Sequence, residues 1–155
     1  MKKVIISCLV LLALTGGMLW LAPHIAGTEL SCRSGFEKNT VTGLHMRGVI
    51  AVHLFRDHTG VASMTGKIIS AEGAWTLNRE TGFHYEVPDA RKGVFRIKKT
   101  YFRALSSDTL PAQYNHDTDM NTTAQDSDYM IIRKINKNTF LFSTPAVPVM
   151  LCVSE

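Results

Sequence analysis

A stretch that begins with glycine and ends in lysine, residues 60–67, comes closest in this sequence to a motif that does chemistry. A phosphate-binding loop places four residues between its glycines, follows its lysine with Ser or Thr, and opens a helix. Here five residues separate Gly60 from Gly66, Ile68 follows Lys67, and the surrounding alternation is that of a strand. We therefore expect no nucleotide site.

The histidines offer a second kind of chemistry, because imidazole and carboxylate groups are common metal ligands. His45 and His53 share one face of an expected strand, and Asp57 and His58 follow in a loop. Solvated strand and turn residues show the same spacing, and we favour that interpretation over a metal site. The motifs G-x-S-x-G, H-E-x-x-H and C-x-x-C do not occur in the sequence. We expect a binding or interaction module, not an enzyme, with no cofactor and no metal.

The long N-terminal apolar run sets the compartment in which the rest of the chain works. Residues 4–22 carry no charge, and at about 1.5 Å per residue they are long enough to cross a bilayer core of ~30 Å as one helix. Two lysines precede the run, so the positive-inside rule keeps the N-terminus in the cytoplasm. We expect an uncleaved transmembrane anchor over residues 1–27 and an exported domain over residues 28–155. A cleaved secretory signal, with small residues at 15–17, is the alternative.

Export makes the three cysteines informative. Cys8 lies inside the apolar run, whereas Cys32 and Cys152 lie at the two ends of the exported part, where disulfides persist. A bridge closing a loop of about 120 residues contributes ~4–5 kcal/mol in the chain-entropy model. We expect Cys32 and Cys152 to be bonded, which would bring the first and last strands together.

The charge of the exported part is close to balanced. Without Lys2 and Lys3 the 17 basic residues fall to 15, against 13 acidic ones, a net charge of +2. We therefore expect no direct contact with nucleic acid, which export also makes implausible. Six basic residues cluster in one segment, where they form a solvated strand face or a docking surface for an acidic partner: Arg91, Lys92, Arg96, Lys98, Lys99 and Arg103.

The hydrophobic pattern from Glu29 onward has a period of two, which is typical of strands. Polar and glycine-containing turns separate seven or eight short runs, and nothing alternates as strand, helix, strand. Gly82 is expected to break or bulge one strand, and Asp108 to cap a short helix in the polar segment 106–128. This predicts a mainly β fold, an antiparallel curved sheet or an incomplete barrel with one short helix. Expected strands cover residues 44–54, 61–70, 74–87, 94–104, 129–135, 139–143 and 149–153.

One face of these strands is a candidate ligand pocket, although an ordinary core explains the same pattern. Its members alternate with polar residues on two expected strands: Leu44, Met46, Ile50, Val52 and Leu54 on one, and Phe95, Ile97 and Tyr101 on the other. Phe55 and Phe102 alternate onto the polar side, which indicates either a partner surface or a cover of loops.

Several local features, taken together, resemble the FidL-like small inner-membrane proteins of enteric bacteria. The resemblance extends over the whole chain. The features are a short anchor followed by Cys32, a strand containing Gly48 before a turn at 57–60, Leu77 and Arg79 in an aromatic strand, Ser107-Asp108-Thr109-Leu110-Pro111, and a closing Pro148 with Cys152.

This resemblance implies a role beside a membrane-bound regulator. FidL-like proteins are similar in organisation to ToxS and VtrC, the partners of ToxR-like transcription regulators with one membrane span. The implied protein is single-pass, with its C-terminal domain in the periplasm. It forms a heterodimer with the regulator, in which the two periplasmic domains share one lipocalin-like barrel. This chain supplies most of the barrel strands and leaves an edge for the regulator's strands, and the shared barrel holds a small amphipathic ligand. No ligand-contacting residue carries over by motif. The alternative is a stand-alone lipocalin-like carrier of a lipid or bile-type ligand.

Overall fold

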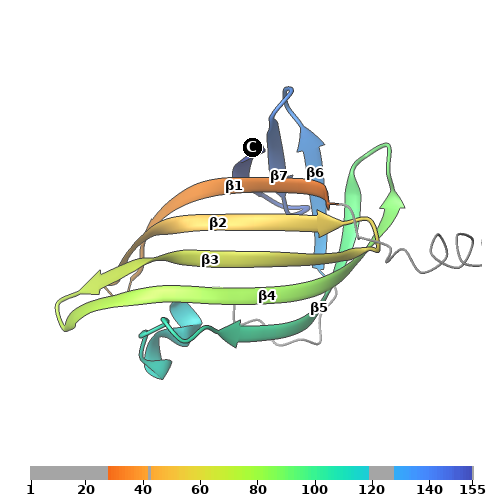
Figure 1. The fold of residues 1–155 in the computed structure, drawn as a ribbon. Helices are drawn as coiled ribbons and strands as arrows, with labels where there is room; N and C mark the ends of the chain where they lie inside the picture. Colours follow the sequence, from red (N-terminus) through yellow and green to blue (C-terminus); the bar gives the residue numbers. More distant parts are fainter. Residues whose placement is uncertain (1–27, 42, 119–127, 155) are drawn as a thin grey trace, which may run out of the picture.

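Eight antiparallel strands, joined in chain order, form a closed barrel in the computed structural model (Figure 1). The structure describes residues 28–41, 43–118 and 128–154, so the expected membrane anchor at 1–27 lies outside the described residues. Among those that are described, no helix is both long and apolar enough to pass through a bilayer. The elements are β1 (Thr28–Asn39), β2 (His45–Phe55), β3 (Thr59–Ser70), β4 (Gly73–Asp89), β5 (Val94–Ala104), η1 (Ala112–Thr118), β6 (Asp128–Lys134), β7 (Thr139–Ser143) and β8 (Pro148–Ser154).

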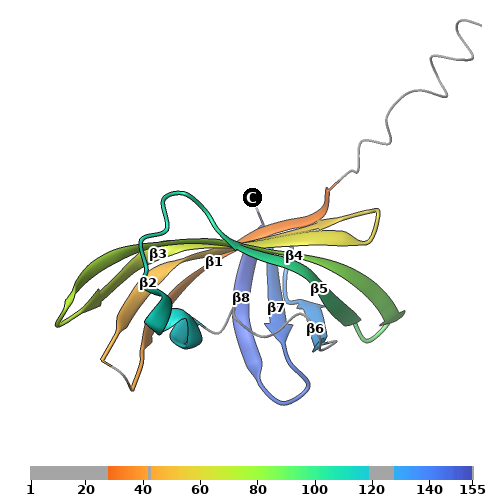
Figure 2. The ribbon, with the colours of Figure 1, turned by 90° about the horizontal axis from the view of Figure 1, so that it is seen from below.

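The barrel has one long side and one short side. Strands β1 to β5 have 11 to 17 residues each and form a broad curved sheet, whereas β6 to β8 have five to seven. Figure 2 shows the short strands under one part of the broad sheet and η1 under another part, on the same side. The short strands therefore close only one end of the barrel.

Closure depends on few residue pairs. Among the residues described, β5 pairs with β6 through four positions, Val94 to Ile97, and β1 pairs with β8 through Cys32 and Arg33 alone. The prediction of a mainly β antiparallel fold is confirmed. The prediction of an incomplete barrel is wrong, because the chain supplies all eight strands and β8 returns to β1.

The inner face of the sheet carries two separate apolar cores. The first fills the closed end and includes Val52, Leu54, Phe83, Tyr85 and Phe142. The second lies under the other end of the broad sheet, where Tyr114 of η1 packs against a cluster formed by Leu44, Met46, Ile68, Leu77 and Leu110. The η1 segment therefore covers the second core, as β6 to β8 cover the first.

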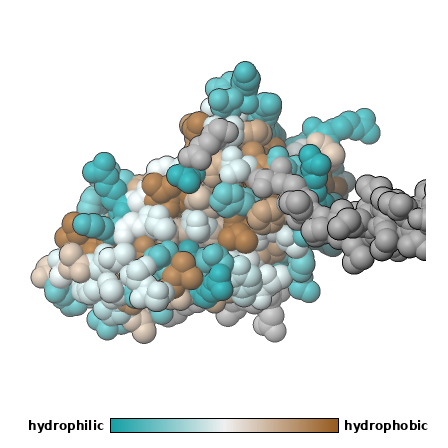
Figure 3. Space-filling model, viewed as in Figure 1, coloured by the Kyte–Doolittle hydropathy of each residue, from teal (hydrophilic) through white to brown (hydrophobic). Residues whose placement is uncertain are grey.

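Glycines at the boundary between the two cores let neighbouring strands approach closely. Gly48 of β2 lies opposite Gly66 of β3, and a Cβ added at Gly48 would lie 2.1 Å from the carbonyl oxygen of Thr65. No side chain fits there, so the backbones themselves pack together. The outer face of the broad sheet shows apolar residues scattered among hydrophilic ones (Figure 3), including the exposed Val49 and Ile69.

The helix expected after Asp108 forms three residues further on, as a 3-10 turn. Asp108 does not cap it. Its carboxylate accepts hydrogen bonds from the backbone N–H groups of Leu110 and Asn78, at 3.1 and 2.9 Å, and pairs with Arg79. Pro111 then precedes η1, which begins at Ala112. Asp108 thus attaches the segment before η1 to β4, and it has no role in starting the helix.

Candidate functional site

The closed end of the barrel contains a cavity of about 280 Å³. This volume lies just below the range of about 300–1,000 Å³ that is usual for small-molecule sites. Apart from Thr81, Lys99 and the phenol of Tyr85, its lining is apolar. The lining residues are Ile50, Val52, Leu54, Ala62, Met64, Thr81, Phe83, Tyr85, Phe95, Ile97, Lys99, Met130, Ile132, Phe142, Val149 and Met150.

Five of the eight residues of the predicted pocket face line this cavity. They are Ile50, Val52 and Leu54 of β2 and Phe95 and Ile97 of β5. Leu44 and Met46 lie before Gly48 on the same face of the predicted pattern, but they pack in the second core and do not line the cavity. The alternating apolar pattern of residues 44–54 is therefore shared between the two cores, and the alternation itself does not show where one core ends and the other begins.

Tyr101 lies on the outside of the barrel because β5 contains a bulge. Gly82 pairs with Tyr101, but the next residue, Phe83, pairs with Lys99, so Thr100 is an extra residue in β5. An extra residue moves the following side chains to the opposite face. A Cβ added at Gly82 would lie 2.0 Å from the Tyr101 ring, so the ring covers this glycine. The bulge expected at Gly82 is thus present, and it removes Tyr101 from the face that holds Phe95 and Ile97.

The outward position of Tyr101 has its own polar partners. Its hydroxyl donates to the carboxylate of Glu80 at 2.6 Å, and this hydrogen bond raises the pKa of Tyr101 above its usual value. Arg103 also donates to Glu80, at 2.8 Å, and lies over the Tyr101 ring. The inner face of β5 after the bulge continues with Phe102, which pairs with Thr81.

Tyr85 closes one end of the cavity. Its hydroxyl lies 2.6 Å from the carbonyl oxygen of Phe55 and 2.9 Å from the carboxylate of Glu29 in β1. Burial, followed by the interaction with Glu29, raises the pKa of Tyr85 to about 12. His58 stacks on the Tyr85 ring at 5.4 Å between centroids. The phenol is therefore engaged with the protein, and its ring presents an apolar surface to the cavity.

Thr81 is a buried polar residue in the cavity wall. It is 6% exposed, and its hydroxyl has no hydrogen-bond partner among the described atoms. A buried hydroxyl of this kind is unfavourable unless something bonds to it. Sequence reasoning did not select Thr81. The signal was present in β4, where it is the one residue with an aliphatic hydroxyl in the inward series Leu77, Arg79, Thr81, Phe83 and Tyr85.

The histidines noted in the sequence have separate partners. His45 Nδ1 lies 2.7 Å from Asn39 Oδ1, and His53 Nδ1 lies 3.0 Å from Ser31 Oγ. Across the described parts of the chain, no group of His, Cys, Asp or Glu residues is arranged to hold a metal ion. We therefore take the cavity as the candidate binding site.

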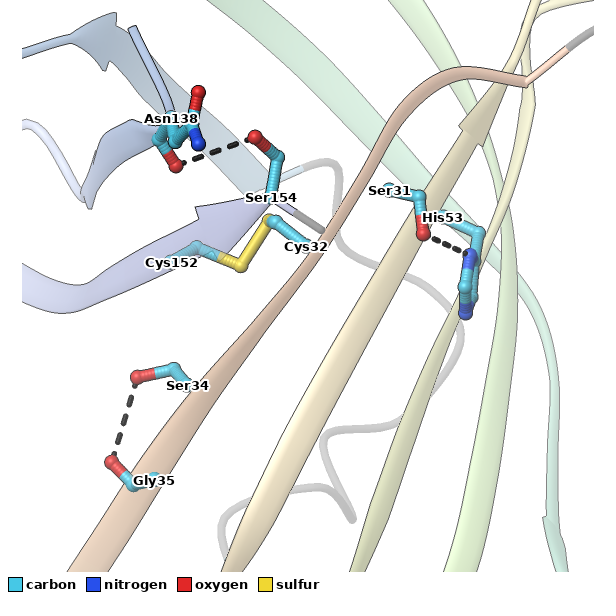
Figure 4. The surroundings of a disulfide bond; sticks show 8 residues. All are labelled: Ser31, Cys32, Ser34, Gly35, His53, Asn138, Cys152 and Ser154. Carbon is cyan, nitrogen blue, oxygen red and sulfur yellow. Dashed lines mark hydrogen bonds between the residues drawn. A yellow bond between two sulfur atoms is a disulfide. The ribbon is translucent and has the colours of Figure 1, made fainter. Parts of the chain in front are cut away.

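The disulfide between Cys32 and Cys152 joins the two strands that close the barrel. Figure 4 shows the bond between β1 and β8, and the two Cα atoms are 5.4 Å apart. Next to it, the N–H of Ser154 donates to the carbonyl oxygen of Asn138 at 2.7 Å. The predicted disulfide is confirmed, and it secures a seam that has only two paired positions.

Comparison with known families places the chain. The model of the family described as FidL-like putative membrane protein matches residues 66–152, which is more than half of the sequence. The chain belongs to the FidL-like family. No curated protein matches it.

The part that matches the FidL-like family holds most of the features described above. It runs from Gly66 in β3 to Cys152 in β8, and so includes Thr81, Lys99 and the short strands that close the cavity. It also includes the Ser107-Asp108 segment that attaches to β4. There Ser107 Oγ accepts a hydrogen bond from Asn78 Nδ2 at 2.6 Å. In this FidL-like protein the segment therefore has a structural explanation, as the attachment of the η1 cover to the sheet.

Proposed function

We propose that this FidL-like chain is a membrane-anchored binding protein that holds a small amphipathic ligand in its barrel and transmits the bound state to a ToxR-like, single-span transcription regulator. The observation that carries the proposal is the apolar cavity of about 280 Å³ inside a barrel closed by the chain's own strands. Small-molecule sites are typically apolar cavities with few polar groups, as here. The proposed role is non-catalytic.

The size of the cavity restricts the ligand. At about 280 Å³ it is at the small end for a drug-sized molecule, which favours a slender chain over a bulky fused-ring compound such as a bile salt. Residues from both sides of the barrel, among them Leu54, Phe95 and Phe142, surround the space. A ligand there would be removed from water over most of its surface.

Two strand edges support pairing with a regulator. β5 from Lys98 to Ala104 and β1 from Ser34 to Asn39 each pair on one side only, as far as the described strands show. An unpaired edge can accept a strand from another chain. The β5 edge carries Lys98 and Arg103, which would favour an acidic partner. The regulator would therefore add to the outside of a complete barrel, without supplying strands that the barrel lacks.

Signalling would follow from a difference in affinity. A ligand shifts a two-state equilibrium only by the ratio of its affinities for the two states. We propose that the filled cavity stabilises the arrangement of β5 and β6 around Lys99, and that the regulator binds one arrangement of this edge better than the other. A shared membrane would raise the effective concentration of the two proteins.

The test is capture of the regulator by the full-length chain. The tagged chain is purified from its own membranes after in-cell cross-linking, and the captured proteins are identified by mass spectrometry. We expect a protein with a winged-helix domain and one membrane span. Lys98→Glu at the β5 edge should reduce capture at least several-fold, whereas Lys137→Glu in the β6–β7 turn should not. Recovery of the chain alone, at normal abundance, would rule out the partnership.

The stand-alone carrier is the second candidate, and barrel closure favours it. Because the eight strands complete the ring, ligand binding needs no strand from a partner. The two candidates differ in one measurable quantity. If the chain is a carrier, its affinity for a ligand is the same with and without the regulator, whereas a sensor shows a difference in affinity between the two states.

A further inference from the structure

Two of the polar residues that line the cavity, Thr81 and Lys99, lie near each other along the paired strands β4 and β5. Thr81 of β4 pairs with Phe102, and Phe83, two residues on, pairs with Lys99. Thr81 and Lys99 are therefore diagonal neighbours on the inner face, a spacing that long side chains can bridge. Pairing between β5 and β6 ends at Ile97, so Lys99 lies just past the point where the two strands separate. The polar end of the cavity is thus the end next to this separation.

Thr81 supplies a hydrogen-bonding group that the protein does not use. Its side chain is more than nine-tenths buried, and its hydroxyl has no partner among the described atoms. The neighbouring lining includes the apolar Ile50, Ala62 and Met64, and Lys99, the other polar side chain at this end, makes no hydrogen bond to it. A hydroxyl both donates and accepts, so a ligand oxygen placed beside it would satisfy an otherwise unfavourable site.

Lys99 gives the same end a positive charge. It lines the cavity as the one charged residue among the lining residues described. Lys99 also has an interaction within the protein, but an ammonium group carries three N–H donors and can bind a ligand at the same time. A hydrogen bond to a charged group is stronger than one between neutral groups. The pair therefore favours an oxygen-bearing anion.

The rest of the cavity suits a single alkyl chain. From Thr81 to Tyr85 the cavity follows β4 for four residues, or about 14 Å at ~3.4 Å per residue, close to the length of an extended chain of about ten carbons. The far end is formed by the rings of Tyr85 and Phe95, whose centroids are 5.7 Å apart, and the Tyr85 hydroxyl points to Glu29 and Phe55. No polar group of that end is left for a ligand among the residues described.

We propose that the cavity binds a medium-chain fatty carboxylate of about ten carbons, with its carboxylate between Thr81 and Lys99 and its alkyl tail against Phe83, Tyr85 and Phe95. This inference rests on the proposed function and names the ligand class of the same cavity. The carboxylate accepts from the Thr81 hydroxyl and from the Lys99 ammonium group. The tail displaces water from apolar surface, which is the main source of affinity.

The test uses the full-length chain in nanodiscs of a zwitterionic phospholipid, with empty nanodiscs as the reference for partition into lipid. Isothermal titration calorimetry measures the binding of three probes with the same ten-carbon tail: decanoate, decanol and decyltrimethylammonium. We expect decanoate to bind at least tenfold more tightly than decyltrimethylammonium, with decanol between them. This comparison needs no variant and cannot be confused with a folding defect.

Matched variants then locate the headgroup. Lys99→Met keeps the aliphatic stem and should weaken decanoate binding about tenfold or more, without weakening decanol binding. Lys137→Met removes a charge from an exposed position in the β6–β7 turn, which does not line the cavity, and should change neither. Thr81→Val keeps the side-chain shape and should weaken decanoate binding several-fold, whereas Thr81→Ser keeps the hydroxyl and should restore most of it. Lys99→Gln replaces Lys99→Met if the latter does not fold.

The outcomes separate this inference from the proposed function. Equal affinity for decanoate and decyltrimethylammonium, or decanoate binding that Lys99→Met and Thr81→Val leave unchanged, would overturn the assigned headgroup site while leaving a ligand-binding cavity. Failure of all three probes to bind would overturn the proposed ligand-binding function itself, and this inference with it.

Discussion

Arg79 Nε lies 2.9 Å from Asp108 Oδ2, and each side chain is only 3% exposed. Arg79 also donates to Asn115 Oδ1 at 2.8 Å, and Asp108 accepts from the backbone of β4 at Asn78. This buried pair connects the broad sheet to the segment that carries η1. This attachment explains why two charged residues, Arg79 and Asp108, are buried in the protein.

Asp108→Asn should destabilise the protein by about 3 kcal/mol or more, because it leaves the Arg79 charge buried without its counter-ion. The matched control is Glu86→Gln, which breaks the exposed pair with Arg96 and should have little effect on stability, because solvent screens an exposed ion pair. Urea unfolding followed by circular dichroism measures both. Equal losses of unfolding free energy in the two variants would show that the buried Arg79–Asp108 pair stabilises the protein no more than an exposed pair does.

Acid should weaken the same attachment. Burial disfavours the ionised form of Asp108, but the hydrogen bonds from Arg79 and Asn78 outweigh it and hold the pKa below its usual value. The unfolded chain therefore binds a proton first, so this contribution is complete above the unfolded pKa of about 3.9 and is lost as pH falls through the folded pKa. Below pH ~4, melting temperature should fall more steeply with pH in the wild type than in Asp108→Asn. Parallel curves would contradict this account.

Gly48→Ala should be strongly destabilising, by about 2 kcal/mol or more, because the new Cβ would lie 2.1 Å from the Thr65 carbonyl oxygen. Gly35→Ala on the neighbouring strand is the control, since its Cβ would meet nothing closer than 3.9 Å. A gain or loss within about 1 kcal/mol is expected there. Thermal melts of the two variants side by side test whether the close approach of β2 and β3 is required.

Replacing both cysteines of the disulfide with serine should lower the unfolding free energy by ~4–5 kcal/mol, since 120 positions separate Cys32 from Cys152. The loss should open the β1–β8 seam first, because only two positions pair there. Hydrogen exchange measured by mass spectrometry should therefore rise most in β1 near Cys32 and in β8. Cys8→Ser should leave both stability and exchange unchanged. Uniform exchange across all strands would argue against a weak seam.

Tyr85 should titrate about two pH units above an ordinary tyrosine, with a pKa of about 12 against about 10. Because the folded pKa is the higher one, this contribution to stability is complete below pH ~10 and is lost as pH rises toward 12. Ultraviolet titration of wild type and Tyr85→Phe should differ by one phenol that ionises near pH 12. If Tyr85→Phe instead lacked a phenol that ionises near pH 10 in the wild type, the buried environment of Tyr85 would be contradicted.

Much of the fold was predictable because alternation is a local property. Strands expected at residues 61–70, 94–104 and 139–143 match β3, β5 and β7 within two residues at each end. The first strand had no separate boundaries in the pattern, and β1 proved to extend from Thr28 to Asn39. Local alternation identifies strands, but it does not say where a regular pattern stops packing in one core and starts in another.

The candidate site was only partly predictable, and Tyr101 shows why. Its place in the alternation after Phe95 and Ile97 predicts an inward side chain, yet one extra residue, Thr100, reverses the face. Whether a strand bulges depends on its register with its neighbour, which is a non-local property. For the same reason Phe102, which the alternation places on the polar side, lies opposite the inward-facing Thr81.

The sequence by itself determined the antiparallel strands, the Cys32–Cys152 pair and the membership of one face in a core, because these follow from local periodicity and from two cysteines placed at the ends of one domain. Only the tertiary structure decided that the barrel closes on its own strands and that its inner face divides at Gly48. It also decided that Thr81 and Lys99 both line the cavity. Each of these depends on which residues of distant strands lie opposite one another, and that register is set by pairing across the whole barrel.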